Sequence, residues 1–132
     1  YKKSQTLDLS ILTEIEKKIF NGLLKSKNIL ELAYLELKKS NLNKPFIGNL
    51  LSEHHQVLRD VLKVSTPKID RMIEAAIEGG AYGGKINGSG GGGCMFAYAP
   101  KNPEQVAKAI KSVGGKAYIV NSDFGTIKIK EV

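Results

Sequence analysis

The most informative part of the sequence is Gly84-Lys85-Ile86-Asn87-Gly88-Ser89-Gly90-Gly91-Gly92-Gly93-Cys94. Nine of the fifteen residues from Gly79 to Gly93 are glycine, and apolar segments border the loop on both sides. Each glycine costs roughly 0.5–1 kcal/mol relative to alanine wherever regular structure would serve. A flexible linker would be richer in serine, asparagine and proline, so we interpret this run as a functional loop.

Glycine allows positive φ angles and has no Cβ, so consecutive backbone N–H groups in such a run can converge on an anion. We therefore expect a loop that closes on phosphate oxygens, or that braces another loop which does. Residues 88–93 satisfy the spacing G-x-G-x-x-G, but that fingerprint opens a helix, whereas Met95-Phe96-Ala97-Tyr98 is typical of a strand. Gly93-Cys94-Met95 also lacks the Gly-Lys-Ser/Thr ending of a Walker A motif.

The first half of the chain is predicted to be helical, because apolar residues recur three and four apart. Asn28 is a suitable N-cap for the second helix, and Thr66 with Pro67 is a typical start for the fourth. Four helices are expected: Leu9 to about Leu24, Asn28 to Lys39, from after Pro45 to Leu62, and Pro67 to Gly79.

After Gly79 the pattern changes to short apolar segments separated by turns. Strands are expected at Ala81–Ile86, Cys94–Ala99, Lys116–Val120 and Thr126–Lys130, with one helix between Asn102 and Gly114. This order predicts an α+β fold, in which helices cover a mostly antiparallel sheet. At 132 residues the chain is expected to form a single domain, residues 1–132.

Composition narrows the class of protein further. The 20 basic and 13 acidic residues give a net charge of +7, but the lysines are scattered, which favours a solvated coat over a nucleic-acid surface. No run of about 18 apolar residues and no signal peptide is visible. The single cysteine excludes an internal disulfide and suits a reducing, cytoplasmic compartment. Because the chain does not begin with Met, we expect it to be a piece of a longer one.

Two carboxylates, Asp60 and Asp70, flank the helix–turn–helix before the glycine loop and are the candidates for a functional role. Their alternatives are a solvated helix end for Asp60 and a favourable helix-dipole position for Asp70. His54 and His55 are adjacent rather than four apart, so we expect no metal site, with one histidine at the edge of the core and the other in solvent. Cys94 is expected beneath the loop as a small apolar residue.

The segment Gly84–Cys94 closely resembles the third conserved motif of the GHMP kinases, which include galactokinase, homoserine kinase, mevalonate kinase and phosphomevalonate kinase. Two preceding segments, His54–Asp60 and Val64–Asp70, lie at the usual distance and look most like the galactokinase branch. The resemblance covers roughly residues 44–132. It implies a ferredoxin-like C-terminal half with added helices, and it implies that the ATP-binding N-terminal half, with the catalytic Asp, is absent from this chain.

The reaction implied by this resemblance is transfer of the γ-phosphoryl group of ATP to a hydroxyl, with Mg²⁺ bridging the phosphates. The acceptor implied is a sugar, as in galactokinase, with a mevalonate-type kinase as the alternative. The implied partners are the missing N-terminal domain and the small-molecule substrate, with no nucleic acid and no membrane. Residues 1–132 alone are expected to be inactive, because no catalytic residue is assigned to them.

From their position before the loop, Asp60 and Asp70 are expected on the substrate side, and the resemblance places a longer set of residues at the ATP phosphates. In that set Asn87 stands where many relatives have threonine, and Lys85 has the alternative of a solvent-facing strand lysine. The phosphate set is Lys85, Asn87, Gly88, Ser89, Gly90, Gly91, Gly92 and Gly93.

Two other classes of function stay open from the residues. An RNA-recognition domain would stack bases on sheet aromatics, but Met95-Phe96-Ala97-Tyr98 lacks its sequence pattern. A stand-alone regulatory domain that binds a phosphorylated metabolite would also use a glycine loop of this kind.

Overall fold

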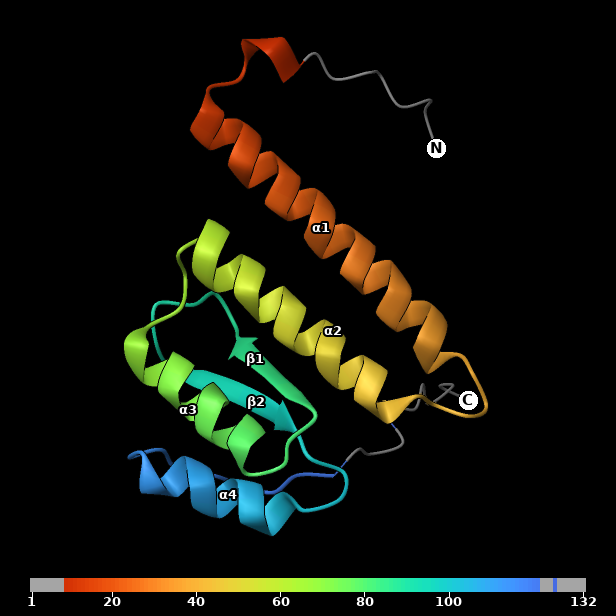
Figure 1. Cartoon of the computed structure of the whole chain (residues 1–132), viewed down its shortest axis with the longest axis vertical. Coiled ribbons are helices and arrows are strands. Elements are labelled where there is room, and N and C mark those ends of the chain that lie inside the picture. The colour runs from red at the N-terminus through yellow and green to blue at the C-terminus, as the bar shows by residue number, and fades with distance from the viewer. Residues whose placement is uncertain (1–8, 122–124, 126–132) are drawn as a thin grey trace, which may run out of the picture.

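Figure 1 shows the computed structural model of the chain, which describes residues 9–121 and residue 125. A short 3-10 turn, Leu9–Ile11, precedes helix α1, Glu14–Leu37; helix α2, Lys44–Gln56, continues into a π-helical turn, Val57–Val61. Helix α3, Pro67–Glu78, strands β1, Gly83–Asn87, and β2, Cys94–Tyr98, and helix α4, Pro103–Ser112, follow. Helices and an antiparallel sheet are both present, so the predicted α+β class is confirmed.

Helix α1 is continuous where the sequence predicts two helices. Asn28, the predicted N-cap, lies inside α1. The observed cap is Thr13, whose hydroxyl accepts from the Glu16 backbone amide while the Glu16 carboxylate accepts from the Thr13 amide, a capping box. The polar run at residues 25–28 contains neither glycine nor proline, so nothing in it breaks the helix.

The connection from α2 to α3 is unusually tight. In the π-helical turn the Leu62 amide donates to the Val57 carbonyl at 3.1 Å. Lys63 then adopts a φ of +56°, a left-handed conformation that is uncommon outside glycine, and the chain turns back toward α3. Thr66 caps α3 through its hydroxyl and Gly79 ends the helix, as the sequence predicts.

The sheet of the described residues has two strands, β1 and β2, which pair antiparallel from Gly83 opposite Tyr98 to Asn87 opposite Cys94. The strand predicted at residues 116–120 is wrong, because these residues have no regular structure and Tyr118 and Val120 are each 83% exposed. An isolated apolar run forms a strand only where a neighbouring strand can satisfy its backbone groups. The strand predicted at residues 126–130 lies outside the described residues.

The main core lies between the hairpin and the two C-terminal helices. Helix α3 contacts both strands and α4 packs against α3 (Figure 1). Ala76 and Ile86 are almost fully buried at the centre. The buried members of this core are Ile69, Met72, Ile73, Ala76, Ala81, Ile86, Val106 and Ile110. No helix among residues 9–121 is both long and apolar enough to span a membrane.

Helix α2 lies against the first strand, and two glycines allow the close approach. A Cβ on Gly83 would overlap the carbonyl group of Gly48, and a Cβ on Gly48 would overlap the backbone of Tyr82. The helix therefore packs directly against the β1 backbone. This contact brings His55 near the end of β1, where the glycine loop begins.

Helix α1 packs against α2 and the π-helical turn on one side and leaves a long apolar face uncovered. The spacing of these apolar residues keeps them within about 100° of one another around the helix axis. We call this surface the α1 apolar face, and its residues, exposed by 37–73%, are Ile15, Ile19, Leu23, Leu30, Tyr34 and Leu37.

Candidate functional site

The glycine loop is the connection between β1 and β2. Because Asn87 pairs with Cys94 at the end of the ladder, residues 88–93 close the hairpin. Five of these six residues have positive φ angles, which side-chain-bearing residues rarely adopt. They are Gly88 (+80°), Gly90 (+90°), Gly91 (+76°), Gly92 (+130°) and Gly93 (+86°). The backbone conformation thus explains why the sequence is so rich in glycine here.

One contact anchors the tip of this loop to the segment between the π-helical turn and α3. The Gly91 amide donates to the Val64 carbonyl oxygen at 2.8 Å. A Cβ on Gly90 would lie only 2.5 Å from the same oxygen, so glycine is required there by packing as well as by φ. At Gly88, Gly92 and Gly93 an added Cβ would meet nothing within 4 Å. One side of the loop is therefore anchored and the other is open.

The loop also contains unpaired backbone donors. Within the described residues, the loop amides other than that of Gly91 have no acceptor in the chain. Free N–H groups on successive residues of a turn can converge on an anion such as a phosphate group. Asn87 and Ser89, both predicted phosphate residues, are exposed at the same loop.

Lys85 lies in β1, ahead of the loop. Its Nζ donates to the Ile86 carbonyl at 2.8 Å and lies 5.5 Å from the centre of the Phe96 ring. Burial lowers the pKa of Lys85, because desolvation disfavours the charged amine. The side chain is half-buried and bonded locally, which differs from the solvent-facing strand lysine considered from the sequence.

Asp70 belongs to a partly buried hydrogen-bond network. In the first turn of α3 its Oδ1 lies 3.0 Å from Nε2 of His55 and accepts from the Ser65 hydroxyl at 2.6 Å. Nδ1 of His55 accepts from the Ile86 amide at 3.4 Å. His55 is 3% exposed, so the prediction that one histidine packs against the core is confirmed. Sequence reasoning named Asp70 but missed this network.

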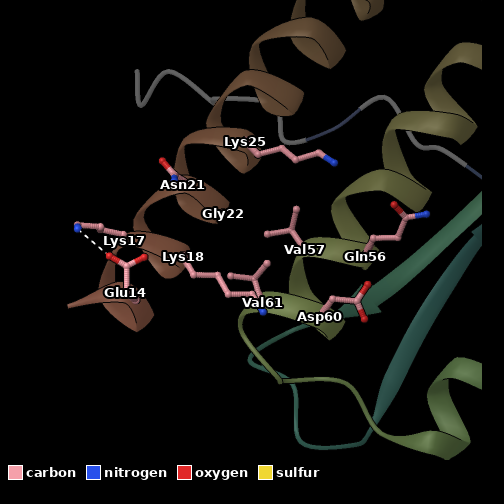
Figure 2. A pocket seen from close by; sticks show the side chains of 10 residues that line it. All are labelled: Glu14, Lys17, Lys18, Asn21, Gly22, Lys25, Gln56, Val57, Asp60 and Val61. Carbon is pink, nitrogen blue, oxygen red and sulfur yellow. Dashed lines mark hydrogen bonds and ion pairs between the residues drawn. The ribbon is translucent and has the colours of Figure 1, made fainter. Parts of the chain in front are cut away.

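Asp60 lies elsewhere, on the rim of a cleft between α1 and the π-helical turn (Figure 2). Arg59 donates to both of its carboxylate oxygens, at 2.9 and 3.2 Å, and this pairing lowers the pKa of Asp60. The structure therefore separates the two predicted substrate-side carboxylates, because Asp70 is in the network and Asp60 is at the cleft.

The cleft has a volume of about 600 Å³, and its lining includes three lysines and two carboxylates. Lys17 bonds to Glu14 at 2.8 Å, whereas Lys18 and Lys25 have no ion-pair partner within the described residues. Gly22 brings α1 close to Val61 at its floor. The lining residues are Glu14, Lys17, Lys18, Asn21, Gly22, Lys25, Gln56, Val57, Asp60 and Val61 (Figure 2).

His54, Cys94 and a possible metal site are the remaining features considered from the sequence. His54 is half-buried rather than in solvent as predicted, and desolvation, followed by the charge of Lys85, lowers its pKa. Cys94 is exposed at the start of β2, so the expectation of a small apolar residue beneath the loop is wrong. Among residues 9–121 and 125, no three His, Cys, Asp or Glu side chains gather as they would around a metal ion.

Comparison with known proteins places most of the chain in one family. The family model described as GHMP kinases C terminal matches residues 26–118. The mevalonate kinase of Pyrococcus furiosus is 44% identical over 86 residues, which are 65% of this chain and 25% of that protein. The galactokinase of Mannheimia succiniciproducens is 35% identical over 81 residues, 59% of this chain and 21% of that protein.

A solved structure shares the fold. The crystal structure of L. major mevalonate kinase in complex with R-mevalonate has a TM-score of 0.54 and 23% identity, and covers 79% of this chain and 35% of that one. The chain spans about a quarter of the length of the curated relatives it matches.

Proposed function

The chain belongs to the GHMP kinases C-terminal family, and from this membership we propose that it is the C-terminal part of an ATP-dependent small-molecule kinase. In this proposal residues 1–132 form one domain whose glycine loop faces the phosphates of ATP. The reaction is transfer of the γ-phosphoryl group to a hydroxyl of the acceptor. Such transfer depends on positioning and on stabilising the charge of the equatorial oxygens.

The observation that carries the proposal is the conformation of the glycine loop. Five of its six residues have positive φ angles, its amides other than that of Gly91 are unpaired, and its tip is fixed to Val64. Backbone donors that are already held in place stabilise developing negative charge without reorganising. We assign this role to the amides of Gly88, Ser89, Gly90, Gly92 and Gly93.

The acceptor that we propose is mevalonate. The support is the identity of 44% with a mevalonate kinase against 35% with a galactokinase. The cleft is consistent with this choice, because mevalonate carries a carboxylate and Lys18 and Lys25 in the lining have no ion-pair partner among the described residues. Galactose is the second candidate, supported by the galactokinase match and by the Leu58-Arg59-Asp60 and Val64–Pro67 segments.

The partner that we propose for the α1 apolar face is the N-terminal half of the same kinase. Six large apolar side chains line one face of a 24-residue helix, and a contiguous exposed patch of this kind marks an interaction surface. The curated relatives are about four times as long as the matched segment, so they contain chain that can cover such a face.

Magnesium is expected for any kinase of this family, but the described residues do not fit a magnesium site. Asp60 is paired with Arg59, and Asp70 is held by His55 and Ser65. No group of three metal-ligating side chains comes together in the described part of the chain. We therefore assign no magnesium ligand to these residues.

The test is a product assay with the whole protein that contains this chain. Incubated with ATP, Mg²⁺ and either R-mevalonate or galactose, it is expected to phosphorylate mevalonate at least about tenfold faster, and residues 1–132 alone are expected to turn over neither. Preferred phosphorylation of galactose would replace the proposed acceptor. ATP-dependent turnover by residues 1–132 alone would contradict the assignment of the catalytic residues to the N-terminal half.

A further inference from the structure

His55 contacts the backbone at the entry of the glycine loop. Its Nδ1 accepts from the Ile86 amide, and a backbone N–H is always the donor, so Nδ1 carries no hydrogen. The hydrogen of the neutral ring is then on Nε2, which donates to Asp70 Oδ1 at 3.0 Å. The network thus selects one tautomer of a buried imidazole.

The Asp70 carboxylate is also linked to the tip of the loop, through Ser65 and Val64. Asp70 Oδ1 accepts from the Ser65 hydroxyl, and Ser65 directly follows Val64, whose carbonyl accepts from Gly91. The contacts therefore close a circuit that runs from His55 to Ile86, through the loop to Gly91, and back by way of Val64, Ser65 and Asp70. The entry and the tip of the loop are both linked to one partly buried pair, His55 and Asp70.

We propose that His55 is a positioning residue, which holds the glycine loop in its anion-binding conformation through Ile86 at one end and through Asp70 and Ser65 at the other. This inference rests on the proposed phosphate-binding role of the loop. Neither His55 nor Asp70 needs to contact substrate in this account. They act by limiting the movement of amides whose usefulness depends on being preorganised.

A purely space-filling role does not explain the choice of residue. Burying polar groups is unfavourable unless they are hydrogen-bonded, and an apolar side chain would fill the same volume without that requirement. Both ring nitrogens of His55 form directional hydrogen bonds, one to β1 and the other to α3. The imidazole is suited to this because its two nitrogens can accept on one side and donate on the other.

Two substitutions of His55 test its two hydrogen bonds separately, the bond with Ile86 at the entry of the loop and the bond with Asp70. In His55→Asn, the amide oxygen lies near the former Nδ1 and can still accept from Ile86, but the link to Asp70 is lost. In His55→Gln, the amide nitrogen can still donate to Asp70, but the acceptor for Ile86 is lost. Ser65→Ala removes the hydroxyl that bonds to Asp70 on the side of the loop tip, with little change in volume. Ser112→Ala, which removes a serine hydroxyl in α4, is the matched control.

The first readout is amide hydrogen exchange in the whole protein without substrate. In His55→Gln we expect exchange at Ile86 to be about tenfold faster. In Ser65→Ala we expect exchange at Gly91 to be about tenfold faster and exchange at Ile86 to be unchanged. Core amides such as Ile73 should exchange as in the wild type in both variants. Unchanged exchange at Ile86 and Gly91, or an increase shared equally by the core, would overturn the proposal. If the His55 variants fail to fold, Ser65→Ala decides the proposal by itself, because unchanged exchange at Gly91 in that variant would overturn it.

The second readout is kinetic. We expect the KM for ATP to rise about tenfold in His55→Gln and in Ser65→Ala with a smaller change in kcat, and His55→Asn to recover part of the loss of His55→Gln. Equal kinetics in all variants would overturn the positioning role. If the wild-type protein phosphorylates no acceptor while the loop amides still respond to these substitutions, the proposed function fails and the positioning of the loop stands.

Discussion

The amide nitrogen of Gly91 lies 2.8 Å from the carbonyl oxygen of Val64, which ties the tip of the glycine loop to the segment that precedes α3. The loop is thus attached to the segment between the helices α2 and α3 as well as to its two strands. This single contact explains why the loop is anchored on one side and open on the other. It also separates the glycines required by packing from those required by backbone conformation alone.

Gly90→Ala and Gly91→Ala test that distinction. Both positions have positive φ angles, so each alanine is strained by about 1–2 kcal/mol. Only the Cβ at residue 90 would also press on the Val64 carbonyl, whereas at residue 91 it would meet nothing within 4 Å. We expect Gly90→Ala to lower kcat/KM of the whole protein by about 10²-fold and Gly91→Ala by clearly less. Equal losses in steady-state assays would show that the Val64 contact has no special role.

Lys63 holds a left-handed conformation that glycine would adopt without strain. Its φ is +56°, and an L-residue in this region costs about 1–2 kcal/mol. Lys63→Gly is therefore expected to raise the free energy of unfolding by about 1 kcal/mol, reduced somewhat by the greater freedom of glycine in the unfolded chain. Urea denaturation measures the change. Lys63→Ala removes the same charge but keeps the strain, so a gain of equal size in that control would contradict the explanation.

The α1 apolar face is expected to be covered in the whole protein. Leu30 lies on this face and Leu35 lies on another side of the same helix, and both are well exposed here, at 69% and 60%. Leu30→Glu should lower the stability of the whole protein by about 2 kcal/mol, because it buries a charge at the contact, and Leu35→Glu should have little effect. Thermal and urea unfolding of the two variants makes the comparison. Equal stability of the two would argue against docking on this face.

Glu36 gives the protein a pH-dependent contribution to stability. Its buried carboxylate accepts from Lys39 Nζ at 2.6 Å and from the Asn43 amide at 2.7 Å, and these bonds, that of Lys39 first, lower its pKa below the ordinary value of 4.5. A lowered pKa means that the ionised form stabilises the fold above pH 4.5, and that this stabilisation is lost as the pH falls through the folded-state pKa.

The corresponding variant is Glu36→Gln. It should be less stable than the wild type at neutral pH, and the difference should shrink as the pH falls below 4.5, where the wild-type carboxylate also becomes protonated. Urea denaturation at several pH values measures this. Glu31→Gln, at an exposed carboxylate on the same helix, is the control. A destabilisation of Glu36→Gln that is constant with pH would contradict the account.

Local signals in the sequence were sufficient for the parts of the fold that local chemistry decides. Thr66, Pro67 and Gly79 predict both ends of α3, and the glycine run predicts the loop between two strands. The capping box of Thr13 and Glu16 was also present as a signal for the start of α1, but it was overlooked. Asn28 has cap chemistry, yet the surrounding residues favour a continuous helix, and tertiary context decided between the two.

The rest depends on contacts between distant segments. The apolar periodicity of α1 indicates which face is apolar, but it cannot indicate what covers that face. His55 and Asp70 are separated by fifteen positions and meet only because α2 and α3 both pack against β1. The apolar run at residues 116–120 has strand chemistry but no strand partner in the described part of the chain, so composition alone misled the prediction.

The central claim is that the free amides of the glycine loop bind the phosphates of ATP, and an NMR titration of the whole protein with Mg·ATP tests it most directly. We expect the amide resonances of Gly88, Ser89, Gly90, Gly92 and Gly93 to shift together and saturably, and that of Gly91 to shift least, because it is already bonded to Val64. Saturable binding that leaves these five resonances unchanged would contradict the claim.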